Sequence, residues 1–375
     1  GVYKSIDGGT TWKLIFGTSI GAALADQLTY IQDIITWVNP TTNLTEVYFG
    51  ADAMYYSEAV GATQWIGTNT VGLWKSTDGV NFAKFTNTAL QSSTDIYCAP
   101  NSFSTDFSGN LFMGTKRSAY GEGGGRIYKC TNGTNWTLVR TLSGVDGRVQ
   151  LKCSRQTAGK AFALCENYTG GVPVIKRSTD NFVADDTTVA LPVSIGAQPP
   201  AANDFCRQQA FYDLMIGLNP TNDEEVYVGG IEIFKTTTAF SGTTSAMWTQ
   251  LTDWTINPTA AGNATANSLD GVHSDHHVMA FCPTQTSCVV FGCDGGVYYS
   301  NNSGTAIGER NKDYNVTQIY KGSLDQSVVN NKMLGGLQDN GSQLLTNPAP
   351  IGASTEVYGG DGCWEFIDKQ QQYMV

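Results

Sequence analysis

The three histidines of the chain lie close together, and imidazole is the side chain best suited to acid–base chemistry and metal binding near neutral pH. His273, His276 and His277 surround Asp275 within one five-residue stretch. On an extended strand His273, Asp275 and His277 would point to one side and His276 to the other, which offers part of a zinc site. A catalytic imidazole fits the same spacing. We expect a hydrogen-bonded structural cluster, with the metal site and the catalytic imidazole as alternatives.

Carboxylates recur at matched places in the sequence. Asp33, Asp213 and Asp275 each stand at the start of an apolar segment that leads to a Pro-containing turn. If these segments are the innermost strands of a repeat, the acids converge on one opening. Hydrolysis of a glycosidic bond needs two carboxyl groups flanking the bond, one of them with a raised pKa. The candidate catalytic acids are Asp33, Asp213, Asp275 and Asp361.

Two turns near the end of the sequence are rich in oxygen ligands of the kind that calcium prefers, at Gln338–Gly341 and Gly360–Gly362. Asp and Asn before Gly also serve ordinary tight turns, and we expect that structural role here. No cofactor is required by the sequence, and calcium is the cation compatible with it. The residues expected to contact a ligand are Tyr212, Asp213, His273, Asp275, His276, His277, Gln338 and Asp339.

One sequence segment recurs along the chain. Its copies predict the strands and turns that position the side chains named above. Its best copies are Gly1–Trp12, Gly72–Phe82 and Arg126–Trp136. Each reads as a strand followed by a tight turn, in which the side chain of Asp7, Asp78 or Asn132 accepts bonds from turn amides and Gly takes a positive φ. The closing aromatic residues Trp12, Phe82 and Trp136 are expected to pack between neighbouring sheets.

A second unit recurs upstream of these turns. Apolar segments that end in Asn-Pro or Cys-Pro lead to a strand that ends in Gly, as in 33–40 with 47–50, 213–220 with 226–230, and 276–283 with 289–292. Together the two units make a four-stranded antiparallel blade. The sequence predicts an all-β fold, a β-propeller of about six blades. We expect residues 1–375 to form a single propeller or a partial array within a longer chain.

The turn segments resemble the Asp-box (BNR) repeats of a group of propellers that includes sialidases, xyloglucanase-type glycosidases and the sortilin-type receptor domain. Within that group the chain is most similar to large secreted bacterial proteins of the sortilin-like kind, through His273–His277, Asp294–Val297, Gly335–Gly341 and Gly359–Gly362. The resemblance implies a secreted or cell-surface protein. Xyloglucanase-type enzymes place their acid and base on two propellers facing across a cleft, whereas this chain contains one propeller or part of two.

Charge and cysteine content narrow the range of partners. The net charge is −11 and the 22 Lys and Arg residues are scattered, so nucleic acid is excluded as an expected partner. No apolar run reaches the roughly 20 residues that a membrane helix needs, so we expect no membrane insertion. Nine cysteines favour an oxidising compartment, and we predict the disulfides Cys282–Cys288 and Cys153–Cys165. Buried free thiols are the alternative.

These observations favour a non-catalytic module that binds a glycan or a protein at the propeller mouth, with exposed Tyr and Trp as contact surfaces. A glycoside hydrolase with paired Asp carboxylates is the first alternative. A structural blade array within a larger surface assembly, in contact with other domains of the same longer chain, is the second.

Overall fold

The computed structural model describes residues 1–17, 30–55, 65–94, 96–196, 198, 204–259, 261–262, 269–312, 317–325, 332–346 and 354–368. The chain forms two compact units, Gly1–Arg310 and Asn311–Val375. The repeats alone led to the expectation of one array over residues 1–375. Most contacts of the last repeat lie within its own unit, and a single propeller or a partial array within a longer chain stays a prediction.

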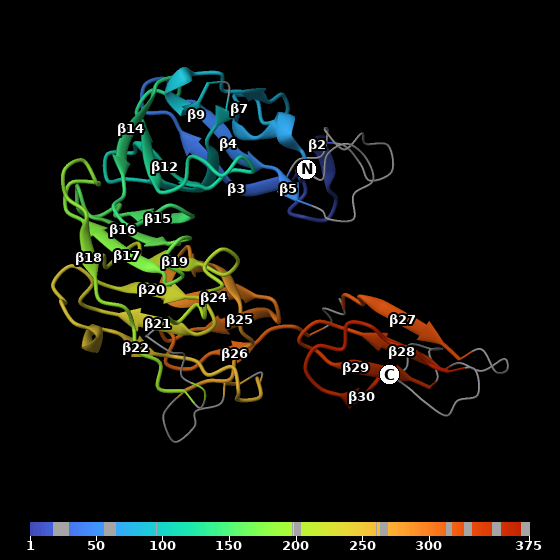
Figure 1. Ribbon diagram of the computed structural model, residues 1–375. Helices are drawn as coiled ribbons and strands as arrows, with labels where there is room; N and C mark the ends of the chain where they lie inside the picture. Colours follow the sequence, from blue (N-terminus) through green and yellow to red (C-terminus); the bar gives the residue numbers. More distant parts are fainter. Residues whose placement is uncertain are drawn as a thin grey trace. The chain divides into compact units, whose positions relative to one another are not determined.

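The first unit contains five four-stranded antiparallel sheets, each built from strands in chain order (Figure 1). The first sheet comprises β3 (Tyr30–Val38), β4 (Thr45–Asp52), β7 (Gly72–Ser76) and β8 (Ala83–Lys84). The second comprises β11 (Ala99–Thr105), β12 (Leu111–Lys116), β13 (Arg126–Cys130) and β14 (Trp136–Thr141), and the third β15 (Val149–Cys153), β16 (Ala161–Cys165), β17 (Val174–Ser178) and β18 (Thr187–Val189). The fourth comprises β19 (Met215–Leu218), β20 (Val226–Gly229), β21 (Ile233–Thr236) and β22 (Thr249–Gln250), and the fifth β23 (His276–Cys282), β24 (Gln285–Cys293), β25 (Gly296–Ser300) and β26 (Gly308–Glu309).

Smaller elements accompany these sheets. Three two-stranded hairpins pair β1 (Val2–Lys4) with β2 (Lys13–Phe16), β5 (Met54–Tyr55) with β6 (Trp65–Ile66), and β9 (Gln91–Ser93) with β10 (Ile96–Tyr97). Short 3₁₀ turns occupy η2 (Thr68–Thr70), η3 (Thr88–Leu90) and η5 (Ser245–Met247). The second unit is one four-stranded sheet of β27 (Lys321–Leu324), β28 (Met333–Gly336), β29 (Ser342–Leu345) and β30 (Thr355–Tyr358).

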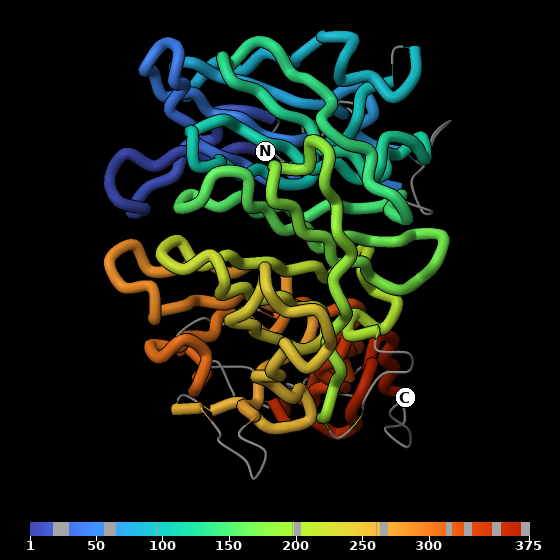
Figure 2. Tube along the Cα trace, turned by 90° about the vertical axis from the view of Figure 1, so that its left-hand side faces the viewer, coloured from blue at the N-terminus to red at the C-terminus, as the bar shows by residue number. Residues whose placement is uncertain are grey.

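The first strands of successive sheets in the first unit lie side by side. β11 contacts β3 and β15, β15 also contacts β19, and β19 contacts β23. The sheets consequently follow one another in chain order, from the blue β3–β8 sheet to the orange β23–β26 sheet (Figure 1). Figure 2 shows the chain after β18 running along the next sheet. The indole N–H of Trp248 donates to the carbonyl of Ala190 in this segment.

A glycine near the end of the second strand allows this close approach of neighbouring sheets. A Cβ at Gly50 would lie 2.6 Å from the carbonyl oxygen of Pro100, and one at Gly114 would lie 2.5 Å from that of Val149. Both distances are shorter than a side chain permits, so a larger residue would push the sheets apart. The recurrence of Gly at this place in the repeat therefore has a packing cause.

Large side chains fill the spaces between sheets. Tyr48 of the first sheet and Trp136 of the second meet edge to face with ring centroids 6.0 Å apart, and both are buried. Further apolar clusters lie between the second and third, third and fourth, and fourth and fifth sheets. Because burial of such aromatic faces is a major source of stability, the core of the unit is a series of layers between sheets.

The turns at Asp78 and Asn132, between third and fourth strands, and the turn at Asp7, between β1 and β2, follow the chemistry expected from the sequence. Oδ1 of Asp78 accepts backbone N–H bonds from Val80 and Asn81 at 2.8 and 2.7 Å. Oδ1 of Asn132 accepts from Thr134 and Asn135 in the same way, at 3.0 and 2.8 Å. Oδ1 of Asp7 accepts from the amide of Thr11 at 2.9 Å. The side chain at this position thus closes the turn whether it is Asp or Asn.

The closing aromatic residues behave differently from one another. Trp136 packs between two sheets as predicted, and Phe82 packs against Phe16 of the β1–β2 hairpin and Phe49 of the first sheet. Trp12 does not pack between sheets: its side chain is 63% exposed and its indole N–H donates to the carbonyl of Gly9. The reason is local, since that bond folds the ring back over its own turn.

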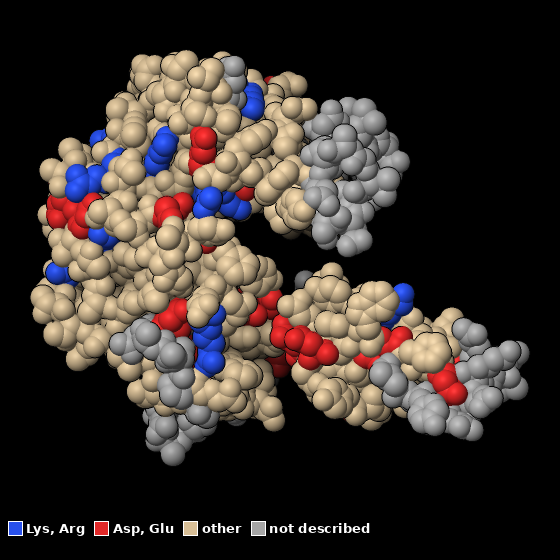
Figure 3. Space-filling model, viewed as in Figure 1, with Lys and Arg blue, Asp and Glu red and all other residues tan. Residues whose placement is uncertain are grey.

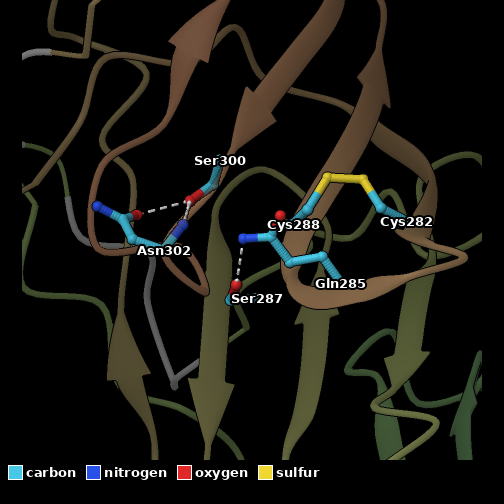
Figure 4. Close-up of a disulfide and its surroundings, with 6 residues drawn as sticks. All are labelled: Cys282, Gln285, Ser287, Cys288, Ser300 and Asn302. Carbon is cyan, nitrogen blue, oxygen red and sulfur yellow. Dashed lines mark hydrogen bonds between the residues drawn. A yellow bond between two sulfur atoms is a disulfide. The ribbon is translucent and has the colours of Figure 1, made fainter.

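One of the two predicted disulfides is present. Cys282 and Cys288 are bonded across the turn between β23 and β24, with their Cα atoms 5.3 Å apart (Figure 4). The prediction for Cys153 and Cys165 is wrong, because both are buried free thiols. The β15–β16 register pairs Cys153 with Ala161 and Cys165 with Val149, which places the two sulfurs at opposite ends of the hairpin.

The fold class is therefore all-β, with the four-stranded antiparallel blades of a β-propeller, as the repeats predict. No α-helix occurs among the residues that the structure describes. Nor does any helix in this part of the chain have the length and apolar character needed to cross a membrane.

Candidate ligand-binding groove

A groove of about 600 Å³ opens at one edge of the sheets in the first unit. It is bordered by the last residues of the second strands β4 and β12, Asp52 and Lys116, and by Arg148, directly before the first strand β15. Second strands end where first strands begin, because the two run antiparallel. Successive sheets consequently bring the same part of the repeat to one rim.

Aromatic side chains surround this groove. The rings of Tyr55 and Trp65, from the β5–β6 hairpin, meet edge to face at 5.3 Å. Tyr168 follows β16 and is 58% exposed, while Phe211 and Tyr212 precede β19 and are 62% and 43% exposed. Aromatic faces of this size are normally removed from water, so their gathering around one groove marks a contact surface.

The carboxylates of the groove are held by neighbouring groups. Asp52 is buried, forms a 2.9 Å ion pair with Lys116, and accepts the backbone N–H of Ala53 at 2.8 Å. Glu166 accepts the backbone N–H of Arg148 at 2.9 Å. Both carboxylates are therefore fixed in position before any ligand arrives.

Arg148 joins three successive sheets beneath the groove. Its Nη1 donates to the carbonyl oxygens of Phe211 and Tyr212 at 3.1 and 2.7 Å, and its Nε donates to Oδ1 of Asn101 at 3.2 Å. Burial lowers the pKa of Arg148, although the charge of Glu166 acts in the opposite direction. The guanidinium thus holds the loop that carries two of the groove aromatics.

The rim next to Tyr212 carries a smaller polar cluster. The Tyr212 hydroxyl donates to Asp294 at 2.9 Å, and Nε2 of His277 lies 2.7 Å from Oδ1 of Asp294. The rings of Tyr212 and His277 meet edge to face at 4.8 Å. Tyr212 is the one expected ligand-contacting residue that the structure places on the groove wall.

The predicted metal ligands His273, Asp275 and His277 are not gathered into a site. Among the described residues no group of three or more His, Cys, Asp or Glu side chains is arranged to hold a metal ion. β23 begins only at His276, and Asp275 has a positive φ of 63°, so the alternation expected of a continuous strand does not apply. His276 itself is fully buried, and burial lowers its pKa to about 3.

The predicted catalytic acids of the first unit, Asp33, Asp213 and Asp275, lie outside the groove. Asp33 bonds to the neighbouring first strand, with Oδ2 2.8 Å from the amide nitrogen of Phe103. Asp213 and Asp275 are buried, and they interact electrostatically with each other. Asp361 belongs to the second unit, where Oδ1 accepts the amide of Asp339, and Gln338 accepts the hydroxyl of Tyr320. Asp33, Asp213 and Asp275 therefore do not line this groove.

The groove residues that sequence reasoning missed share one position in the repeat. Asp52, Lys116 and Glu166 stand at or just after the end of a second strand. A usable signal was present, because charged residues directly follow the apolar run that ends each of these strands. In the view of Figure 3, side chains of both charges are interspersed on the first unit rather than segregated.

Comparison with known proteins finds neither a matching family model nor a matching curated protein. The chain is similar to two solved GH74 structures, an enzyme of Niastella koreensis and the xyloglucanase of Xanthomonas campestris, at 17% and 13% identity and a TM-score of 0.45 for each. The matches cover 96% and 98% of this chain but only 54% and 57% of those chains. It is also similar to YCF48 bound to a D1 peptide, at 12% identity and a TM-score of 0.41, covering 86% of this chain and 84% of that one. The fold class rests on the sheets described above.

Proposed function

We propose that this chain is a secreted or cell-surface module that binds a glycan in the groove. The observation that carries the proposal is the ring of exposed aromatic side chains around a groove whose polar groups are already fixed. Sugars present apolar C–H faces and hydroxyl edges, so a site for them combines aromatic surfaces with oriented hydrogen-bonding groups. Binding pockets in general join a mainly apolar lining with a few placed polar groups.

The dimensions and chemistry of the groove support an oligosaccharide. Its volume of about 600 Å³ falls within the range of roughly 300–1,000 Å³ that small-molecule sites occupy. Trp65 and Tyr168 offer ring faces, and the ion pair of Asp52 with Lys116 offers both acceptors and donors to hydroxyl groups. Pre-positioned side chains lose little conformational freedom on binding, which favours affinity.

The proposal includes the Asp-box identity of the turns and an extracellular location. The bonds made by Asp7, Asp78 and Asn132 within their turns support the first. The disulfide between Cys282 and Cys288 supports the second, since such bonds persist mainly in oxidising compartments.

The test is calorimetric titration of the whole chain with a panel of plant and bacterial oligosaccharides. Trp65→Ala and Tyr168→Ala should each weaken binding by about tenfold, because each removes a stacking surface. The matched control is Trp12→Ala, since Trp12 is exposed but lies on the β1–β2 hairpin outside the groove. Absence of binding to every member of the panel, or equal loss with the control variant, contradicts the proposal.

A glycoside hydrolase is the second candidate, because Asp52 and Glu166 both border the groove. Two carboxyl groups on either side of a bound glycosidic bond are what such a reaction requires. Release of reducing sugar that disappears in both Asp52→Asn and Glu166→Gln would establish it. Binding without release of sugar would support the non-catalytic glycan-binding module instead.

A further inference from the structure

Arg117 occupies a distinctive place in the groove. It directly follows β12, and its guanidinium lies over the ring of Tyr168 with Cζ 4.2 Å from the ring centroid. A planar guanidinium stacked on an aromatic face attracts the ring and keeps its N–H groups directed outward around its edge. The stack therefore presents a fork of donors to the groove.

Both members of the stack are held in place. A Cβ at Gly121 would lie 3.1 Å from Nη2 of Arg117, so the guanidinium packs closely against this glycine. The backbone N–H of Tyr168 donates to Oδ1 of Asp146 at 2.8 Å, which fixes the loop that carries the ring. The arrangement is thus built from three segments of the chain rather than from one flexible side chain.

Among the groove residues that the structure describes, the guanidinium of Arg117 is not engaged in an ion pair. Lys116 is paired with Asp52 at 2.9 Å, and Arg148 is engaged by the carbonyl oxygens of Phe211 and Tyr212. Within the part of the chain that the structure describes, no carboxylate lies within ion-pair distance of the Arg117 guanidinium. A neutral sugar would accept hydrogen bonds from the guanidinium but would leave its charge without a counter-ion.

We infer that the groove binds an acidic glycan, with the carboxylate of a uronic acid residue held by the edge of the Arg117 guanidinium. The inference rests on the proposed function and names its ligand class. A carboxylate is planar and accepts two parallel N–H bonds from arginine, a geometry that a lysine ammonium does not reproduce. Sugar units next to the uronic acid would then contact the exposed aromatic rings of the groove.

The experiment compares oligouronides with their carboxyl-reduced counterparts, which have the same linkages but no charge. We expect the wild-type chain to bind the oligouronide at least about tenfold more tightly. Arg117→Gln should remove this preference while retaining the affinity for the reduced oligosaccharide. Arg117→Lys should keep only part of the preference for the oligouronide, because it retains the positive charge but loses the planar pair of N–H donors. Melting temperatures of all variants verify that they fold, and Lys13→Gln is the control for a charge outside the groove.

The outcomes separate the two proposals. Equal binding of charged and reduced oligosaccharides, or a preference that survives Arg117→Gln, overturns the inference and leaves glycan binding intact. Tighter binding of sulfated oligosaccharides than of oligouronides also overturns it, because the ligand class is then a sulfate ester. If no oligosaccharide binds at all, the proposed function fails and the inference fails with it.

Discussion

The carboxylate of Asp33 accepts a 2.8 Å hydrogen bond from the backbone amide of Phe103, which lies 70 residues further along the chain. This bond connects β3 to β11, the first strands of two neighbouring sheets. Similar bonds connect the next pair, where the hydroxyl of Ser102 donates to the carbonyl of Val149 and accepts the amide of Leu151. Polar residues on first strands therefore hold neighbouring sheets together.

Replacement of Asp33 should weaken this connection. Asp33→Ala removes the acceptor of a largely buried backbone N–H, and we expect it to lower the free energy of unfolding by about 1–3 kcal/mol. Asp33→Asn keeps an acceptor and should cost less. Urea unfolding followed by tryptophan fluorescence measures both, with the partly exposed Glu122→Ala as control. Equal stability of Asp33→Ala and the control would show that the bond contributes nothing.

The blade architecture could be predicted from the sequence because its signals are local. The turn around Asp78 and the glycine near the end of second strands such as β4, which carries Gly50, recur along the chain and act within a few residues. The role of Asp33 could not be predicted in this way. Its partner Phe103 lies in another repeat, and a polar residue at the start of a first strand reads equally well as a ligand contact.

The turn residues should affect stability and not ligand binding. Backbone N–H bonds from Asn81 and Val80 hold the pKa of Asp78 well below its usual range, so its carboxylate supports the fold above the unfolded pKa and loses this effect in strong acid. Asp78→Ala should lower the melting temperature by a few degrees. Asp78→Asn should lower it less, since Asn132 closes the equivalent turn. Loss of glycan binding at an unchanged melting temperature would contradict a structural role.

Thiol mapping tests the cysteine assignments. Alkylation of the unfolded but unreduced chain should modify seven of the nine cysteines and spare Cys282 and Cys288. In the native chain Cys153 and Cys165 should react slowly, because burial removes them from solvent and raises the pKa of Cys153 to about 12. Cys282→Ser with Cys288→Ser should lower the free energy of unfolding by about 2 kcal/mol through the lost loop constraint. A mapped Cys153–Cys165 bridge would reverse the correction made from the strand register.

The candidate groove was less predictable from the sequence than the fold. Tyr212 was found because it precedes a first strand, whereas the signal for Lys116 and Glu166, a charged residue after the apolar run of a second strand, does not by itself show which of these strand ends meet. The groove depends on how successive sheets bring these ends together. That geometry follows from packing between repeats, which a single sequence does not reveal.

The buried carboxyl group of Asp213 should make stability depend on pH. Neither of its oxygens has a hydrogen-bond partner from another of the described residues. Burial, assisted by the nearby charge of Asp275, raises the pKa of Asp213 to about 9. The folded protein then keeps a proton that the unfolded chain releases near pH 4, so this group destabilises the fold progressively as the pH rises from about 4 to 9. Asp213→Asn, which is neutral at every pH, should remove that slope.

Thermal unfolding at several values between pH 6 and pH 9 measures the effect. Asp213→Asn should match or exceed the wild-type melting temperature at pH 9, and the difference between variant and wild type should shrink toward pH 6. His276 acts in another window: burial lowers its pKa to about 3, so it reduces stability only as the pH falls below about 6.5. Glu232→Gln is measured beside it, because burial raises the pKa of Glu232 to about 8 and this group should contribute a separate part of the slope. The pH dependence of the melting temperature could persist unchanged in Asp213→Asn and disappear in Glu232→Gln. That result would assign the retained proton to Glu232 instead of Asp213.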